Sequence, residues 1–277
     1  MVYAPLMQAY GTAIVAGVSA GQGGKEIQGT PVFDMVEQAI AAVGSIQISV
    51  IFVPPYAVLD AALEAMAAGI RHLILITEGV PPLDMVHLLR RSEATETLVV
   101  GPSCPGIIVP GKILLGTHPP DLYAPGSIGL VSRSGSLTYE VAQELTQGGF
   151  GQSIAVSIGG DRIPGSSFQQ WLQILEEDDQ TEAIVLVGEI GGESEEMAAR
   201  YIAEAIDKPV VAYVAGRTTP KGQLIGHAGA IISARMAGMG ADVGTMTSKV
   251  TAFKRAKIPL AKSPSEIPLL LKRVMKA

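Results

Sequence analysis

The chain has 277 residues, of which 48% are hydrophobic and 17% charged, and it contains 32 glycines and 18 prolines. This length and composition suit a compact, loop-rich α/β protein and exclude a disordered or fibrous chain. The net charge of −6 argues against nucleic-acid binding, because proteins that bind nucleic acid usually carry a basic patch.

Short β-branched runs alternate with helix-like segments along most of the chain, which is the pattern of βαβ units around a mainly parallel sheet. The first segment, Ala4–Tyr10, is predicted to be a helix. The predicted strands are Ala13–Val18, Ile46–Phe52, Leu73–Ile76, Leu98–Val100, Ile128–Val131, Ser153–Ser157, Ala183–Val187 and Pro209–Tyr213. The predicted helices between them are Val32–Ala42, Val58–Ala68, Leu83–Glu93, Thr138–Gly148, Ser167–Glu177 and Ser194–Ala205.

One stretch, Pro102–Gly126, is the poorest in helix signal and the richest in proline and glycine, which indicates a domain boundary. We expect a first domain over residues 1–105, a linker over 106–126 and a second domain over 127–277. A nucleotide-binding α/β domain usually opens with a strand and a glycine-rich phosphate loop. Neither precedes Ala4–Tyr10 in this sequence, so the first domain is expected to be incomplete at its N-terminus.

The segment VSRSGSLTYE (Val131–Glu140) follows a predicted strand and leads into a predicted helix. Ser132, Ser134, Gly135 and Ser136 would supply hydroxyl groups and backbone N–H groups at a helix N-terminus, where anions bind favourably. Serine- and glycine-rich turns are also ordinary helix caps. From these residues alone, a phosphate site and a plain cap are equally good interpretations.

His227 lies between small residues in the segment GQLIGHAGAII (Gly222–Ile232). Gly226 and Gly229 would let the backbone approach closely and adopt positive φ, so the loop could admit a phosphate. Glu189, in VGEIGGE just beyond a predicted strand, could hold an imidazole in one tautomer. On residue type alone, a histidine that fills a turn and a solvated glutamate are the favoured interpretations. His72, His87 and His118 are expected to be structural or solvated.

Cys104 is the only cysteine of the chain, which excludes an internal disulfide and fits a reducing, cytoplasmic location. Its turn, GPSCPG, is shaped by two prolines and has no histidine nearby in the sequence, so we favour a structural role over a nucleophilic one. No apolar run reaches the roughly 18 residues that a membrane span needs, and no cleavable signal is visible. We therefore expect a soluble chain without membrane contact.

Taken together, these segments resemble the α subunit of succinyl-CoA synthetase (succinate–CoA ligase), from about Tyr10 to the C-terminal helix. Several long motifs occur in the family's order, which makes chance agreement implausible. The most specific blocks are TEGVPP at Thr77–Pro82, GPSCPG at Gly101–Gly106, VSRSGSLTYE, GFGQSIAVSIGGDRIPGSSF at Gly149–Phe168, DDQTEAIVLVGEIGG at Asp178–Gly192 and KGQLIGHAGAII at Lys221–Ile232.

The resemblance implies a fold and an activity. The fold would be a truncated Rossmann-like CoA-binding domain followed by a flavodoxin-like ligase domain. The activity would be that of an acid–thiol ligase of the tricarboxylic acid cycle. Such an enzyme forms succinyl-CoA from succinate, CoA and a nucleoside triphosphate through a phosphohistidine. The nucleotide, ATP or GTP with Mg²⁺, would be bound by a partner β subunit of the ATP-grasp type, because the phosphate-loop motif GxxxxGK[ST] is absent from this sequence.

The resemblance also gives roles to individual residues. His227 matches the phosphorylated histidine, and Glu189 matches the carboxylate that orients it. The turn Ser132–Ser136 matches the helix N-terminus that holds the phosphate, and Tyr139 matches a residue near the organic substrate at the subunit contact. Among the positions expected to contact CoA, Ile76, Thr77 and Glu78 match the family, whereas Gln22 replaces the usual lysine and Lys25 stands three residues further on.

Some features depart from the family pattern. The glycine loop of the type GFTGSQGT that grips CoA has no counterpart before Val2, the usual Asn of GPNCPG is Ser103, and extra residues stand at Met236–Gly244. Two other functions therefore remain open: a ligase for malate or another dicarboxylate, and a non-catalytic subunit that senses CoA. A start upstream of Met1 would explain the missing strand and loop. The sequence leaves open whether the assembly is αβ or α₂β₂.

Overall fold

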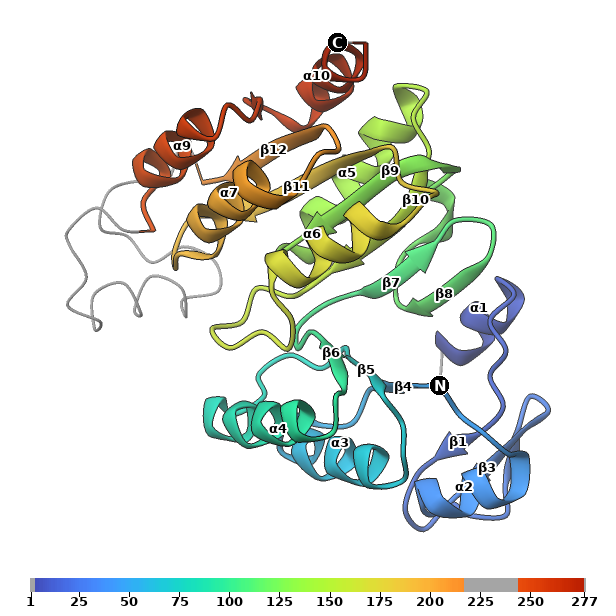
Figure 1. Cartoon of the computed structure of the whole chain (residues 1–277). Coiled ribbons are helices and arrows are strands. Elements are labelled where there is room, and N and C mark those ends of the chain that lie inside the picture. The colour runs from blue at the N-terminus through green and yellow to red at the C-terminus, as the bar shows by residue number, and fades with distance from the viewer. Residues whose placement is uncertain (1–2, 217–243, 277) are drawn as a thin grey trace.

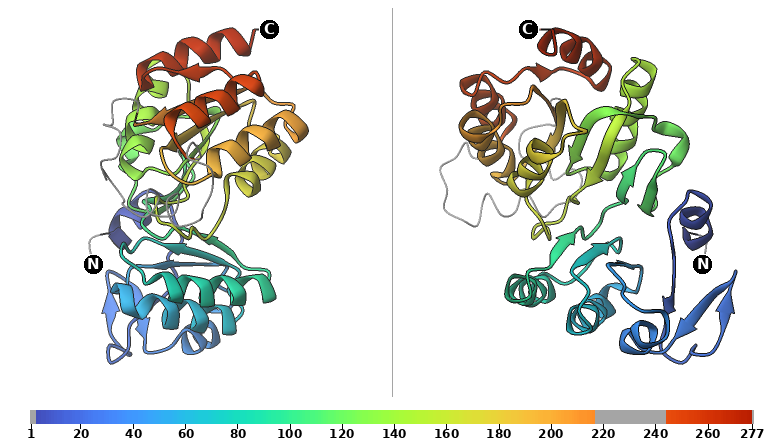
Figure 2. Two further views of the ribbon diagram at one scale, coloured as in Figure 1. Left: turned by 90° about the vertical axis from the view of Figure 1, so that its left-hand side faces the viewer. Right: turned by 45° about the vertical axis from the view of Figure 1, so that its right-hand side comes forward.

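The structure, a computed structural model, describes residues 3–216 and 244–276. The described chain forms two lobes that both combine helices with strands (Figures 1 and 2). Helix α1 (Tyr3–Ala9) lies beside the second lobe, although it opens the chain. There the backbone N–H of Gly116 donates to Met7 Sδ at 3.2 Å, and Thr12 exchanges two hydrogen bonds with the backbone of Leu114.

The first lobe holds two separate three-stranded sheets. The first sheet has the order β1-β3-β2 and is followed by α2; their bounds are β1 (Gly17–Val18), β2 (Glu26–Ile27), β3 (Thr30–Phe33) and α2 (Val36–Val43). The second sheet is parallel, in the order β4-β5-β6, with helices between its strands; their bounds are β4 (Ile48–Ile51), α3 (Val58–Ala67), β5 (His72–Leu75), α4 (Pro82–Ala94) and β6 (Leu98–Val100). Apolar residues of α3 and α4 pack on this second sheet, which gives the lobe its core.

The second lobe is built on one seven-stranded sheet in the order β13-β12-β11-β9-β10-β7-β8. Strands β9 to β13 pair in parallel, and β7 and β8 form an antiparallel hairpin at one edge. The strands are β7 (Gly106–Val109), β8 (Ile113–Gly116), β9 (Pro125–Ser132), β10 (Gln152–Ser157), β11 (Ala183–Glu189), β12 (Val210–Ala215) and β13 (Leu260–Ala261). The helices are α5 (Gly135–Gln147), α6 (Phe168–Glu177), α7 (Ser194–Ala205), α9 (Met246–Arg255) and α10 (Ile267–Val274), with 3₁₀ turns at Pro120–Leu122 and Pro264–Glu266. A further 3₁₀ turn, Pro55–Ala57, precedes α3 in the first lobe.

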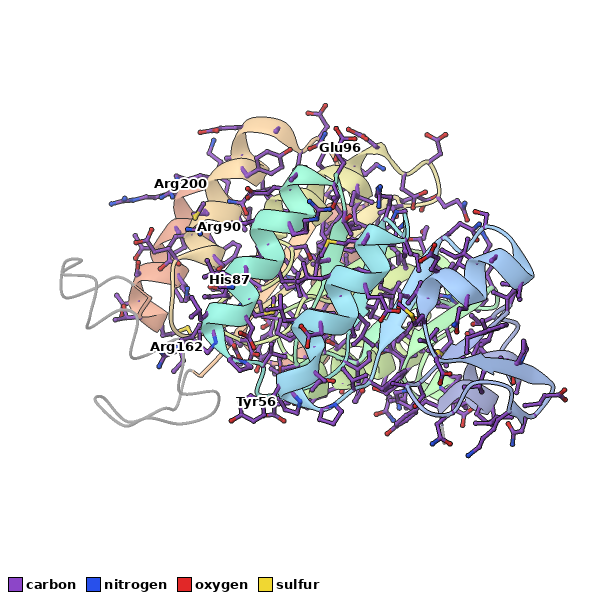
Figure 3. All side chains as sticks on the ribbon, turned by 90° about the horizontal axis from the view of Figure 1, so that it is seen from below. Tyr56, His87, Arg90, Glu96, Arg162 and Arg200 are labelled. Carbon is purple, nitrogen blue, oxygen red and sulfur yellow. The ribbon has the colours of Figure 1, made fainter. Side chains whose placement is uncertain are left out.

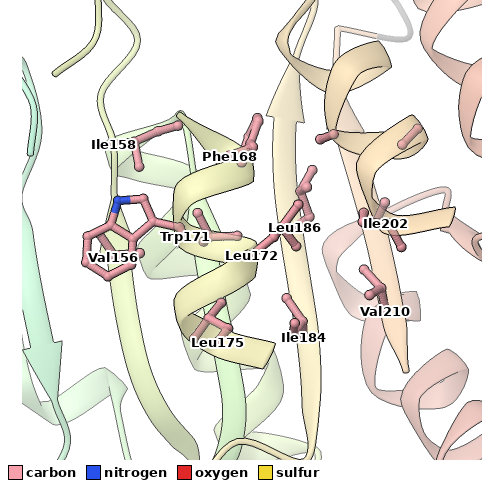
Figure 4. Close-up of a cluster of buried hydrophobic side chains, with 14 of the residues drawn as sticks. Val156, Ile158, Phe168, Trp171, Leu172, Leu175, Ile184, Leu186, Ile202 and Val210 are labelled. Atoms are coloured by element: carbon pink, nitrogen blue, oxygen red, sulfur yellow. The ribbon is translucent and has the colours of Figure 1, made fainter. Parts of the chain in front are cut away.

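Both faces of the large sheet are covered by helices, so its strands are apolar on both sides, as is usual for parallel sheets. Along β11, Ile184 and Leu186 point to the face that α6, α7 and α9 cover (Figure 4). The alternate residues Val185 and Val187 point to the face that α5 and α10 cover. Parallel strands end at the same edge of a sheet, so the residues at the carboxyl ends of β9, β10 and β11 gather at one place.

The expected α/β class is confirmed, and most predicted elements lie within a few residues of their expected bounds. The segment 106–126, expected to be a linker, instead holds β7 and β8, and β7 pairs with β10 of the second lobe. The hairpin turn Pro110–Gly111 accounts for the proline and glycine that suggested a connector. The predicted helix Val32–Ala42 is also partly wrong, because Thr30–Phe33 is a strand and the helix begins at Val36.

Among the helices that the structure describes, none is both long and apolar enough to cross a membrane.

Candidate functional site

The turn between β9 and α5 is held by its own serines. Ser134 caps α5, because its side chain accepts a hydrogen bond from the backbone N–H of Leu137 at 3.4 Å. The hydroxyl of Ser132 donates to the carbonyl of Ser134 at 2.9 Å and accepts from its N–H at 3.1 Å. Gly135 begins the helix and Ser136 is exposed on its first turn. The four expected phosphate-site residues therefore form one turn at the N-terminus of a 13-residue helix, whose dipole favours an anion.

Ser157, which none of the sequence motifs indicated as a site residue, lies on the same face of the sheet as Ser132. Ser157 ends β10 in register with Ser132 of β9. Strand alternation places both side chains on the face that carries Leu130 and Ala155, which is the face under α5. The Ser157 hydroxyl is fully buried, and among the described residues it has no hydrogen-bond partner.

Glu189 is the last residue of β11, at the same edge of the sheet. Val187 is in register with Ser132, and the backbone N–H of Arg133 donates to the Val187 carbonyl at 3.0 Å. The side chain of Glu189 is 21% exposed, and one of its oxygens lies 3.6 Å from Nη2 of Arg133. The structure therefore brings the Glu189 carboxylate and the serine turn to neighbouring strand ends.

Behind Glu189 lies a buried set of charged side chains from three elements. Arg133 Nη1 donates to Oε1 of Glu195 on α7 at 3.0 Å, and Lys249 on α9 donates to Oε2 of the same carboxylate at 2.5 Å. Burial alone would lower the pKa of Arg133, but the carboxylates of Glu195 and Glu189 outweigh it and raise that pKa. These partners are 54 to 62 residues apart in the sequence, so no local pattern could have pointed to them.

Tyr139 lies on α5 and packs against a buried histidine. The rings of Tyr139 and His118 meet edge to face, with centroids 5.8 Å apart, and burial raises the pKa of Tyr139. His118 Nδ1 is 2.7 Å from the hydroxyl of Tyr123, and burial lowers the pKa of His118 to about 4. His118, expected to be structural or solvated, is therefore a buried neutral ring beside the expected substrate-contact residue.

The expected CoA-contacting residues Ile76, Thr77 and Glu78 directly follow β5. Thr77 donates its hydroxyl proton to the carbonyl of Val53 at 2.6 Å, which fixes the start of the turn, and Glu78 is exposed. Next to this turn lies a cavity of about 470 Å³, at the N-terminus of α4. Its lining residues are Tyr56, Gly79–Pro82, Met85 and Asp161–Ile163. Figure 3 labels Tyr56 and Arg162 on this side of the molecule.

The other two expected CoA contacts lie on a different sheet. Gln22 and Lys25 are exposed in the turn between β1 and β2, and the Lys25 ammonium donates to the side-chain oxygen of Gln22. The Lys25 charge is thus available at the surface, three residues from the position where the resemblance expects it.

Cys104 is buried, and burial raises the pKa of its thiol to about 12. A thiol with that pKa is not a nucleophile near neutral pH, in agreement with a structural role. In the portions 3–216 and 244–276, no group of three or more His, Cys, Asp or Glu side chains is placed to hold a metal ion. His227, the candidate nucleophile, lies outside the described residues.

Comparison with known families matches both parts of the chain. A CoA binding domain family matches residues 4–79, and a CoA-ligase family matches residues 131–258. Among curated relatives, the succinate–CoA ligase [ADP-forming] subunit alpha 2 of Archaeoglobus fulgidus is 47% identical over 96% of this chain and 90% of its own length. The corresponding alpha subunit of Aquifex aeolicus is 44% identical over 96% of this chain and 86% of its own length.

Two solved structures with the same fold belong to longer chains. The ATP citrate lyase of Methanothrix soehngenii, in complex with citrate and coenzyme A, matches 94% of this chain and 43% of its own, with a TM-score of 0.81 and 28% identity. A dinucleotide-forming acetyl-coenzyme A synthetase of Ca. Korarchaeum cryptofilum matches 94% of this chain and 54% of its own, with a TM-score of 0.71 and 22% identity. The second match bears on the fold alone.

Proposed function

The chain belongs to the family of succinate–CoA ligase alpha subunits, and from that premise we propose that it forms succinyl-CoA from succinate and CoA, with His227 as the phosphorylated residue. The observation that carries this proposal is the meeting of Glu189 with the Ser132–Ser136 turn at one edge of the large sheet. An anion site and a carboxylate side by side are what a phosphorylated imidazole requires.

The chemistry assigned to this chain is nucleophilic catalysis in two transfers. A neutral imidazole nitrogen of His227 accepts the γ-phosphoryl group of the nucleotide, and the Glu189 carboxylate accepts a hydrogen bond from the N–H of the other ring nitrogen and so fixes the tautomer. The phosphoryl group then passes to the carboxylate of the organic acid. The resulting acyl phosphate is attacked by the CoA thiol, which releases phosphate.

The N-terminus of α5 stabilises the phosphoryl oxygens during these transfers. Its free N–H groups and its dipole contribute roughly 0.3–1 kcal/mol when exposed and up to about 2 kcal/mol when partly buried. Ser134 and Gly135 are half-buried, so we assign the α5 terminus a value between these limits. Tyr139, half-buried on the same helix, is assigned a place near the organic acid.

CoA is assigned to the first lobe. The cavity beside Ile76–Glu78 is lined by two prolines and by Tyr56 of the first lobe, and by Arg162 and its two neighbours, which follow β10 of the second lobe. A flat apolar wall next to a guanidinium suits a nucleotide base joined to phosphates. Thr77 and Glu78 directly precede the lining residue Gly79 in the chain, and we assign Lys25, exposed in the turn after β1, as a further cation for the phosphates.

The nucleotide and its Mg²⁺ are assigned to a β subunit of the ATP-grasp type, since no phosphate-loop motif stands in this sequence. The choice between ATP and GTP belongs to that partner. We also propose a cytoplasmic location, which the single cysteine supports because a chain with one cysteine and no internal disulfide suits a reducing compartment.

The first test uses this chain co-purified with its β subunit and γ-labelled nucleotide. We expect acid-labile label on this chain in the wild type and in the control His72→Asn, whose exposed histidine lies on β5, and none in His227→Asn. Succinate and CoA added together should discharge the label. Label that malate discharges instead would redefine the acid, and label that nothing discharges would contradict the CoA site. A wild type without label would refute the catalytic function.

A further inference from the structure

We propose that Arg133, Glu195 and Lys249 form a positioning set that holds the Glu189 carboxylate in place for phosphoryl transfer. The proposal rests on the function given above, because Glu189 acts there on His227. Neither the motifs nor the family resemblance assigned a role to these three residues.

The centre of the set is the carboxylate of Glu195, which is fully buried on α7. Its Oε1 accepts from Arg133 Nη1 at 3.0 Å and from the backbone N–H of Glu189 at 3.1 Å. Its Oε2 accepts from Lys249. Three donors, from β11, α9 and the turn between β9 and α5, therefore converge on one side chain, and one of them is the backbone of Glu189 itself.

Lys249 is also fully buried, and all three of its N–H donors make hydrogen bonds. Besides Glu195 it donates to Oε2 of Glu196 at 2.8 Å and to the carbonyl of Gly192 at 2.9 Å. An ammonium group has three donors, so this lysine is satisfied without water. It ties α9 to α7, which lie side by side (Figure 1), and to the turn after Glu189.

The turn after β11 is thus held at three backbone points. The Glu195 carboxylate accepts a hydrogen bond from the N–H of Glu189. Arg133 Nη1 donates to the carbonyl of Gly191 at 3.2 Å, and Lys249 donates to the carbonyl of Gly192. The side chain of Glu189 forms a separate ion pair with Arg133 Nη2, at 3.6 Å. Backbone and carboxylate are both constrained, which is what positioning a catalytic carboxylate to within a fraction of an ångström requires.

The charges explain why such a set would be kept. Within the described part of the chain, two cations, Arg133 and Lys249, face three carboxylates, those of Glu189, Glu195 and Glu196. Of the three carboxylates, Glu189 has the most exposed side chain, so it is the one that an imidazole N–H could reach from outside. Buried ion pairs seldom stabilise a fold more than apolar residues would, so stability alone does not account for five charges at this place.

The test is a double-mutant cycle on the rate of labelling in a single turnover, in the complex with the β subunit. Arg133→Lys keeps the charge but loses the two-pronged geometry, and we expect it to slow labelling about tenfold when Glu189 is present. In a Glu189→Gln background the same change should have almost no further effect, because Arg133 acts through that carboxylate. Lys249→Met should behave in the same way. Equal slowing in both backgrounds would overturn the proposal.

A matched control separates positioning from loss of stability. Lys208 donates to the carbonyls of Leu175 and Asp178 at 2.8 and 2.7 Å, at the opposite end of the sheet. Lys208→Met also removes lysine hydrogen bonds, so we expect it to lower the denaturant midpoint while leaving the labelling rate of the folded complex unchanged. A labelling rate reduced as far as in Lys249→Met would contradict the proposal.

A second readout does not depend on activity. The Glu189 carboxyl resonance, identified by its loss in Glu189→Gln, is followed by ¹³C NMR across pH. Removing the cation in Arg133→Met should raise the titration midpoint of Glu189 by about one pH unit, because a nearby positive charge favours the ionised carboxylate. An unchanged midpoint would overturn the positioning role. If the wild type failed to label, the function would fall while this titration still decided the positioning.

Discussion

Gly188 and Glu195 are in such close contact that only a glycine fits on the strand. A Cβ atom added to Gly188 would lie 2.4 Å from Cγ of Glu195 and 2.8 Å from its Oε1. The missing side chain therefore makes the space in which the Glu195 carboxylate receives Arg133 and Lys249. A strand glycine just before Glu189 is thus explained by packing and not by backbone conformation.

The first prediction follows from this contact. Gly188→Ala should displace Glu195 and lower the free energy of unfolding by about 1–3 kcal/mol, as overpacking in a filled core does, and it should slow the labelling of His227. Gly17→Ala is the control, because a Cβ there would meet its nearest atom at an ordinary 3.5 Å. Urea unfolding followed by circular dichroism measures the free energy of unfolding of both variants. Equal stability of the two variants would contradict the close contact.

The second prediction compares two helix caps. Ser134 caps α5 at the proposed phosphate site, and Ser167 caps α6 in a capping box with Gln170. Each change to alanine should lower the free energy of unfolding by about 1 kcal/mol. In the complex with the β subunit, only Ser134→Ala should slow the labelling of His227, because only that cap lies at the phosphate. If Ser167→Ala slowed labelling as much, the effect would belong to stability and the phosphate site would be refuted.

Local signals in the sequence were enough for much of the fold. Leu98–Val100 and Ser194–Ala205 have their predicted bounds, because a short β-branched run and an amphipathic stretch each carry their own preference. The strand at Thr30–Phe33 was missed because it exists through pairing with β1 and β2, which a local pattern does not contain. The β7–β8 hairpin is hidden for the opposite reason, since its turn residues, proline and glycine, are equally typical of a linker.

The candidate site also has a local part that the sequence predicts and a long-range part that it does not. The serine turn is local in the chain, so a strand, a cap and a helix in succession were enough to predict it. Arg133 lies inside the motif VSRSGSLTYE, but its partner Glu195 is far from it in the sequence, and Lys249 lies in no recognised motif. Their partner, Glu195, is brought to them by the packing of α7 and α9 against β9 and β11. A single sequence does not record such long-range pairing.

The third prediction concerns two serines of β10. Ser157 has a buried hydroxyl without a partner among the described residues, whereas the hydroxyl of Ser153 is 2.6 Å from that of Thr181. Ser157→Ala should be neutral or raise the free energy of unfolding by up to about 1 kcal/mol, and Ser153→Ala should lower it by about 1–2 kcal/mol. Urea unfolding of the two variants checks this. Comparable destabilisation would mean that Ser157 has a partner after all, such as a buried water.

The last prediction is a pH dependence that originates at His118. Its pKa is about 4 in the folded chain, and its ordinary value is 6.5. Above pH 6.5 the ring is neutral in both the folded and the unfolded state and contributes nothing to the pH dependence. As the pH falls from 6.5 to 4, only the unfolded chain takes up this proton, so the folded state loses up to about 3 kcal/mol of stability, and below pH 4 the loss is complete.

His118→Gln removes the titrating ring while keeping a polar group for the hydroxyl of Tyr123. Its stability at pH 7 should fall because packing against Tyr139 is lost, but the decline between pH 6.5 and 4 should be shallower than in the wild type by about 3 kcal/mol in total. His72→Gln, at an exposed position, should keep the wild-type slope. The measurement is the free energy of unfolding in urea at half-unit steps of pH. Parallel curves for wild type and His118→Gln would mean that His118 takes up its proton equally readily in the folded and unfolded chains. That outcome would contradict a buried, neutral His118 ring beside Tyr139.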